Sequence, residues 1–198
     1  MMLRSSRGIL ALAALLIAAV YVFPLWHIGL HAPQYPEGLG MYIWVDQITG
    51  QKPHDLDLIN GLNHYIGMQE IVPDAIPELR FMPVISGALL VFGLLAALLG
   101  RRSLLYAWVG VFLLVAVLGL ADFWLWGYNY GHNLDPTAAI KVPGMSYQPP
   151  VIGSKRLLNF RAASWPSIGG WSLVISVLIG LWLSVREFRR ARTAAHTT

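Results

Sequence analysis

Histidine and methionine are the side chains through which this sequence could bind a soft metal, because it contains no cysteine. Imidazole nitrogen and thioether sulfur together suit monovalent copper, and the same two groups serve as axial ligands of haem iron. The lack of cysteine excludes disulfides, thiolate metal sites and c-type haem attachment. A soft metal site in this chain would therefore have to be built from histidine and methionine.

One such pair lies in residues 53–68, PHDLDLINGLNHYIGM. This segment predicts a short helix that begins near Asp55, a residue type favoured at helix N-termini, and it carries apolar residues at helical spacing. His64 and Met68 are four residues apart, so a helix through both would point imidazole and thioether the same way. The pair is a candidate copper site, and packing in a hydrophobic core is the alternative explanation of the same spacing.

Further donors lie outside this segment. We expect His132 or Met145, the latter directly after Gly144, to complete a metal site across two regions of the chain, because a bound ion needs three or four ligands. His27 and His31 are also four residues apart, at the end of the first apolar run. If that run continues as a helix, the two imidazoles share one face and could chelate an ion or face lipid headgroups.

The composition indicates that these residues belong to a membrane protein. Of the 198 residues, 56% are hydrophobic and only 12% are charged, against about 25% charged residues in an ordinary soluble domain. The mean hydropathy is +0.57. The net charge of +4 comes from 14 basic and 10 acidic residues. Because the basic residues cluster beside apolar runs, they indicate membrane topology and not binding to nucleic acid.

Four apolar runs are long enough to cross a bilayer as helices, which takes about 20 residues each. They cover residues 8–30, 81–99, 103–126 and 168–185 in approximate bounds, within one membrane domain that spans residues 1–198. Since backbone groups in lipid must be hydrogen-bonded internally, the predicted fold class is an all-α membrane protein with four transmembrane helices. The first run is longer than the apolar core of a cleaved signal peptide, so we interpret it as a retained anchor.

The basic residues also predict the orientation. They gather at the N-terminus, in the turn at 100–103 and in the C-terminal tail, which places both chain ends in the cytoplasm and the protein in a bacterial inner membrane. Two long loops, at about 31–80 and 127–167, would then be periplasmic. The first loop is acidic, the second is basic, and both are rich in aromatic and aliphatic residues. We therefore expect the two loops to pack together as a cap that brings 61–68 near 131–147.

Three strings in these loops are distinctive: DLINGLNHYIGM at 57–68, GHNLDP at 131–136 and KVPGMSYQPP at 141–150. Together they resemble a bacterial family of small multi-pass membrane proteins that are encoded beside nitrous oxide reductase and its copper-maturation factors. The resemblance covers most of residues 38–162. It implies a role in copper handling or electron supply for a periplasmic copper enzyme, with that copper protein or its maturation factors as partners beside the lipid bilayer.

Three functions stay open at this point. The first is an accessory protein that binds copper on the periplasmic side for the maturation or support of a copper enzyme. The second is an electron-transfer subunit that binds b-type haem, with His64 axial to the iron, or interacts with quinol. The third is a docking or assembly subunit without a cofactor. The sequence contains no hydrolase, nucleotide-binding or kinase motif and no evident nucleophile, so it does not point to an enzyme.

Overall fold

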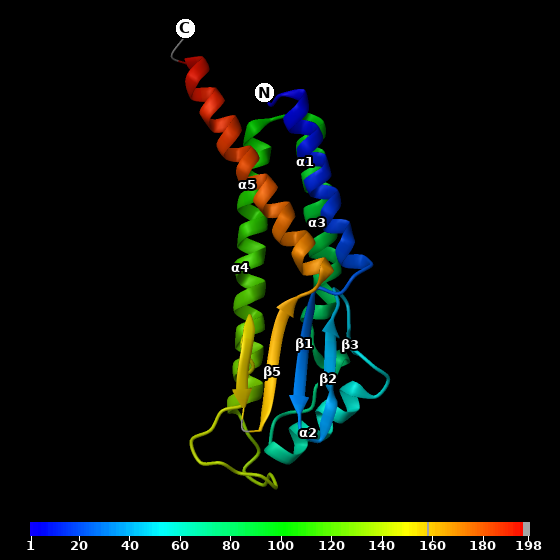
Figure 1. Cartoon of the computed structure of the whole chain (residues 1–198). Helices are drawn as coiled ribbons and strands as arrows, with labels where there is room; N and C mark the ends of the chain where they lie inside the picture. The colour runs from blue at the N-terminus through cyan, green and yellow to red at the C-terminus, as the bar shows by residue number, and fades with distance from the viewer. Residues whose placement is uncertain (158, 196–198) are drawn as a thin grey trace.

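The computed structural model, which describes residues 1–157 and 159–195, has a bundle of long helices at one end and a β-sheet with a short helix at the other (Figure 1). The two ends of the described chain lie at the far end of the bundle, away from the sheet. Along its long axis, the molecule therefore consists of a helical part followed by a part that carries the sheet.

The helical part is formed by four long helices. They are α1 (Arg4–Leu16), which continues through the 3₁₀ helix η1 (Ile17–Tyr21), α3 (Glu78–Leu99), α4 (Arg102–His132) and α5 (Ile168–Ala195). Within the described residues, these four are long and apolar enough to cross a membrane, in agreement with the predicted number of spans. The first candidate span ends at Tyr21, well before the predicted end near residue 30.

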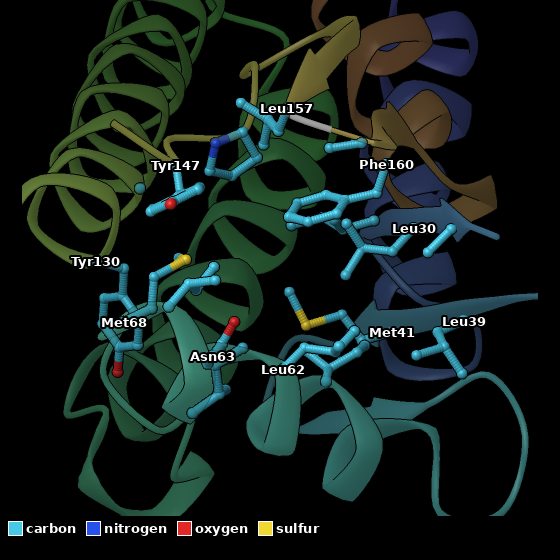
Figure 2. A pocket seen from close by; sticks show the side chains of 18 of the residues that line it. Leu30, Leu39, Met41, Leu62, Asn63, Met68, Tyr130, Tyr147, Leu157 and Phe160 are labelled. Carbon is cyan, nitrogen blue, oxygen red and sulfur yellow. The ribbon is translucent and has the colours of Figure 1, made fainter. Parts of the chain in front are cut away.

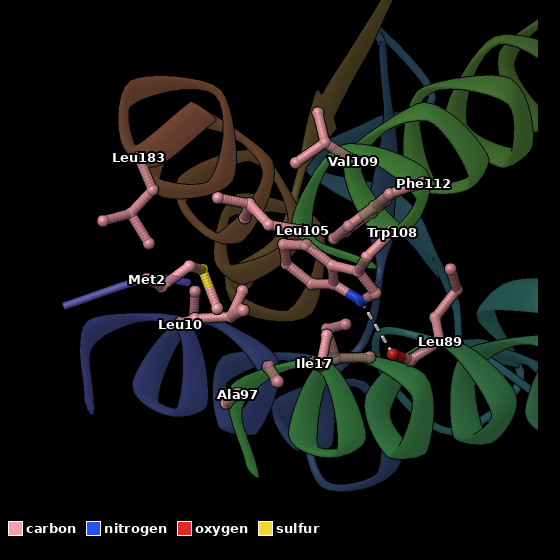
Figure 3. Packing of buried hydrophobic residues seen from close by; sticks show 13 residues of the cluster. Met2, Leu10, Ile17, Leu89, Ala97, Leu105, Trp108, Val109, Phe112 and Leu183 are labelled. Atoms are coloured by element: carbon pink, nitrogen blue, oxygen red, sulfur yellow. Dashed lines mark hydrogen bonds between the residues drawn. The ribbon is translucent and has the colours of Figure 1, made fainter. Parts of the chain in front are cut away.

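Trp108 of α4 lies in the core of the bundle and is fully buried. Its indole nitrogen donates a hydrogen bond of 2.9 Å to the carbonyl oxygen of Leu89 on α3, so its polar group is satisfied (Figure 3). A Cβ at Gly93 of α3 would come within 2.8 Å of the indole nitrogen, and one at Gly180 of α5 within 2.7 Å of a ring carbon. The two glycines therefore allow three helices to pack closely around one indole ring.

A buried carboxylate joins the helices at the end away from the sheet. Glu187 of α5 is fully buried, and it accepts a 2.6 Å hydrogen bond from Ser6 Oγ and a 3.0 Å hydrogen bond from Arg102 Nε. These contacts connect α1, α4 and α5. Arg7 of α1 donates to backbone carbonyls in the last turn of α3. Part of the basic charge at this end is thus structural, because a buried carboxylate needs such partners.

At the other end, five strands form one antiparallel sheet in the order β3-β2-β1-β5-β4. The strands are β1 (Trp26–Ala32), β2 (Tyr35–Ile43), β3 (Ile48–Gly50), β4 (Gly153–Leu157) and β5 (Phe160–Pro166). The prediction of an all-α fold is therefore wrong. The two long connections that were expected as loops supply a sheet between them.

The segment WHIGLHA at 26–32 explains this error. By hydropathy it continues the first apolar run, but its apolar residues Trp26, Ile28 and Leu30 alternate with residues that face the other way, which is the period of a strand. Pro24 lacks a backbone N–H and does not favour continuation of the helix. β1 then pairs on one side with β2, the next strand in the sequence, and on the other side with the distant β5.

The short helix α2 (Asp55–Ile66) covers one face of the sheet, which we call the inner face. Asp55, expected to cap the helix, is instead its first residue, and His54 occupies the N-cap position. The buried Asp55 fixes its start, because Oδ2 accepts hydrogen bonds from the backbone N–H of Gly40 in β2, at 3.0 Å, and of Lys52, at 3.2 Å. The 3₁₀ helix η2 (Pro73–Ala75) follows before α3. The carboxylate thus ties the helix to the sheet.

The two connections form one unit, which we call the cap (residues 26–75 and 133–166). Both contribute strands to the same sheet. Two backbone hydrogen bonds also join them, from the N–H of Asp135 to the carbonyl of Gly67 at 2.8 Å and from the N–H of Ile140 to the carbonyl of Tyr65 at 2.9 Å. The structure therefore brings the two connections together, as predicted, and places the end of α2 against the segment that follows α4.

The cap is attached to the bundle by short, hydrogen-bonded junctions. The carbonyl of Leu25, just before β1, accepts the N–H of Ser167 at 2.9 Å, and the carbonyl of Pro24 accepts the N–H of Gly169 at 2.9 Å. Gly170 packs too closely against the Leu25 carbonyl to admit a Cβ. The segments that enter β1 and leave β5 are thus in contact where the sheet meets α5.

Candidate functional site

His27 and His31 lie on β1, on the face of the sheet opposite α2. His27 Nε2 is 2.9 Å from Gln51 Oε1, and the exposed His31 ring packs over Gly38. Four residues of a strand extend over about 13 Å, whereas four residues of a helix rise only about 6 Å. The helical geometry from which a shared metal ion was predicted is therefore not present.

His64 and Met68 point to different sides of the cap. α2 ends at Ile66, and Gly67 has a left-handed conformation with φ of 78°, so the helix stops before Met68. The N–H of Met68 donates to the carbonyl of Asn63 at 2.8 Å, which closes the helix end. His64 is exposed, whereas Met68 faces a pocket in the interior of the cap. The common stripe predicted for the two side chains does not form.

His64 lies beside Asp135 of the second connection. The hydroxyl and the backbone N–H of Thr137 each donate a 2.7 Å hydrogen bond to Asp135 Oδ1. These bonds lower the pKa of Asp135 below its ordinary value, and the positive charge of a nearby His64 imidazolium acts in the same direction. The imidazole is therefore next to the connection that was expected to complete its site.

His132, the last residue of α4, is exposed and stacks on Tyr128 with ring centroids 4.0 Å apart. Its Nδ1 is 3.0 Å from the carbonyl oxygen of Tyr128. An Nδ1–H that donates there leaves Nε2 available, which is the arrangement of most metal-binding histidines. Met145 is partly exposed and lies two residues before Tyr147, whose N–H donates to the carbonyl of Gly131 at 3.0 Å. Met145 thus belongs to a segment alongside the end of α4.

In the part of the chain that the structure describes, no three histidine, aspartate or glutamate side chains are grouped so that they could hold a metal ion. A copper site at this surface would include a thioether, as the sequence predicts, and would draw its donors from separate elements.

The cap and the C-terminal end of α4 surround a pocket of about 70 Å³ (Figure 2). Its walls are the inner face of the sheet, α2, the last two turns of α4 and the segment at 147–149. The side chains that the sheet and α2 contribute include Leu30, Met41, Leu62 and Asn63, and those from α4 and the following segment include Trp126, Tyr130, Tyr147 and Pro149. The lining is predominantly apolar, as in most small-molecule sites.

Two hydrogen-bond donors of this lining have no partner. Trp126 Nε1 and the Tyr147 hydroxyl are buried, and no acceptor among the described residues lies within hydrogen-bonding distance of either. Tyr147 is only 2% exposed. Leaving a buried polar group unpaired costs about 1–3 kcal/mol. These two groups therefore distinguish the pocket from the rest of the interior.

Three other aromatic donors in the cap and its vicinity have hydrogen-bond partners. Trp26 Nε1 donates to Ser164 Oγ at 2.7 Å, and Trp44 Nε1 donates to Thr49 Oγ1 at 2.9 Å. Within the pocket wall itself, the Tyr130 hydroxyl donates to a backbone carbonyl at 3.4 Å. Trp126 and Tyr147 therefore differ from these three residues, because their buried donors have no partner.

Two thioethers also border the pocket. Met41 reaches it from β2 and Met68 from the end of α2, and Figure 2 shows the two side chains on different sides of the enclosed space. Sequence reasoning identified Met68 as a ligand candidate, but it did not identify the pocket. Two features of the sequence could have indicated the pocket. One is the alternation of apolar residues at 26–32, and the other is the spacing of Trp126 and Tyr130, which places both on one side of a helix that extends past residue 126.

The chain matches no family model and none of the curated proteins with which it was compared. The fold and the site define its class: the described chain has four helices suited to a membrane and an antiparallel cap that encloses an apolar pocket.

Proposed function

We propose that the protein is an accessory protein of the bacterial inner membrane, with both chain ends in the cytoplasm, which binds copper on its periplasmic side and supports a periplasmic copper enzyme of the nitrous oxide reductase type. One observation carries this proposal. The three strings behind the family resemblance, which are separate in sequence, meet at the junction of α2 with the segment after α4.

The donors proposed for copper are the exposed or partly exposed members of the predicted set around this junction. His64 lies beside Asp135, His132 is three residues before it, and Met145 belongs to the segment that bonds to Gly131. Two imidazoles and a thioether suit monovalent copper. An accessible set of donors on separate elements also suits a metal ion that is passed to another protein. Met68 faces the interior and has no part in this set.

The test is a titration of the purified protein with monovalent copper against a chromophoric chelator. We expect one copper ion per chain, and at least about tenfold weaker binding in His64→Ala and in His132→Ala. His31→Ala is the matched control, because it removes an exposed imidazole from the opposite face of the cap, and it should bind copper as the wild type does. Absence of stoichiometric binding, or an equal loss in the control, would overturn the proposal.

A docking role is the second candidate, favoured by the face of the sheet that α2 leaves uncovered. The side chains of His27 and His31 lie on this face, and so do their partners in register, Trp165 and Arg161. Trp165 is 49% exposed. Such a surface, aromatic and basic, fits an acidic partner protein. A preparation that binds no copper, shows no Soret band of haem and still retains an acidic periplasmic protein would favour this role.

A further inference from the structure

The pocket in the cap has a chemistry that the copper proposal does not use. Its walls are apolar, and its two free polar groups, Trp126 Nε1 and the Tyr147 hydroxyl, both offer a hydrogen to an acceptor. We propose that the pocket binds the carbonyl-bearing end of an apolar membrane molecule, either an isoprenoid quinone or an acyl ester of a phospholipid. This inference does not depend on copper binding.

The unpaired donors specify the polar part of the ligand. A carbonyl oxygen has two lone pairs and no hydrogen, so it can accept from an indole N–H and a phenol O–H together. The neighbouring polar groups do not compete for it, because the Tyr130 hydroxyl and the amide nitrogen of Asn63 already donate to backbone carbonyls. A ligand carbonyl could therefore accept from either of these buried donors.

The size and lining of the pocket specify the rest of the ligand. A volume of about 70 Å³ is several times what one water molecule requires, but it is too small for a whole lipid. Apolar cavities of this kind tend to exclude water and to bind apolar groups. Leu62, Met68 and Pro149 in the lining keep part of their surface accessible, so a ligand could extend outward from the enclosed end. An elongated molecule that inserts one end meets these conditions.

The position of the pocket along α4 indicates that this molecule comes from the membrane. If the hydrocarbon layer begins at Arg102, about 20 residues of helix bring the chain to its outer edge near residue 122. Trp126 then lies about 6 Å beyond that edge and Tyr130 about 12 Å beyond it, within or just above the headgroup layer. Carbonyl groups of membrane amphiphiles lie in the interfacial layer, so Trp126 is at a depth that they reach.

The experiment uses the full-length protein, delipidated in detergent, and measures binding by native mass spectrometry with two probes. One is a quinone with a short alkyl tail and the other is a short-chain phosphatidylcholine. We expect one molecule of one probe per chain. Tyr147→Phe keeps the ring and removes the unpaired hydroxyl, so it should weaken binding about threefold to tenfold. Tyr65→Phe is the matched control, because it makes the same change at an exposed tyrosine outside the pocket lining, and it should bind as the wild type does.

Preferential binding of the quinone or of the phospholipid, with the loss confined to Tyr147→Phe, supports the proposal and identifies the source of the carbonyl. The proposal is overturned if neither probe binds at one per chain, or if Tyr147→Phe binds as tightly as the wild type. Should Tyr147→Phe fold poorly, Leu62→Trp provides a second test, since a larger side chain at this partly buried position in the pocket wall should block the pocket and abolish binding. Unchanged binding in a folded Leu62→Trp protein would likewise overturn it.

Discussion

Replacement of Glu187 by alanine should destabilise the helical bundle strongly. The carboxylate is fully buried and accepts hydrogen bonds from Ser6 at 2.6 Å and from Arg102 at 3.0 Å. Its removal leaves a partly buried guanidinium without its partner, and breaking a buried ion pair in this way costs about 3–5 kcal/mol. The Arg102 side chain keeps 29% of its surface exposed, so we expect the lower end, about 3 kcal/mol of the free energy of unfolding.

The assay is reversible unfolding in mixed micelles of mild and denaturing detergent, followed by circular dichroism. Glu70→Ala, at an exposed position in the cap, is the control and should change the free energy of unfolding by less than about 0.5 kcal/mol. The double variant with Arg102→Ala should be about 1–3 kcal/mol more stable than the sum of the single effects predicts. A loss for Glu187→Ala within about 1 kcal/mol of the control, or strict additivity in the double variant, would refute the reasoning.

Two further predictions concern the packing of the bundle and the titration of the cap. Gly93→Ala would place a Cβ 2.8 Å from the Trp108 indole nitrogen and should destabilise the protein by about 1–3 kcal/mol in the same unfolding assay, whereas Gly110→Ala, where a Cβ meets open space, should not. Asp135, whose pKa is lowered by two hydrogen bonds from Thr137, should titrate below the ordinary value of about 3.9 in carboxyl NMR of aspartate-labelled protein. Its stabilising contribution is present above that ordinary value and is lost as the pH falls through the lowered pKa. Thr137→Val should raise this pKa, and an unchanged titration would contradict the assigned cause.

The helical half of the fold could be predicted from sequence because hydropathy over about 20 residues is a direct measure of the ability to cross a membrane. The start of α2 near Asp55 could also be predicted, although the Asp55 carboxylate binds the backbone of Gly40 and Lys52 and does not cap the helix. Residues 26–32 show the limit of this reasoning. Their apolar content is typical of a helix in a hydropathy window, whereas in the structure they pair as a strand with the neighbouring 35–43 and with the distant 160–166.

The candidate site was predicted in its parts but not in its arrangement. Met68 and the string that contains Tyr147 could be singled out from their residue types. That Met68 would turn inward depends on Gly67 ending α2 just before Met68, and that Tyr147 would face the same pocket as Trp126 depends on α4 continuing to His132. Such outcomes are set by helix ends, which local patterns fix only to within a few residues.

The hydrogen-bonded junctions at Leu25 and Ser167 have a mechanical consequence. The junctions connect η1 to β1 and β5 to α5, and β1 and β5 are paired with each other. The sheet is therefore attached to the bundle at two neighbouring strands and not through one flexible linker. Its position relative to the helices is set when the chain folds. For the docking role proposed above, a partner protein would meet a surface already aligned, and the rotational freedom that a tethered domain loses on association would have been lost beforehand.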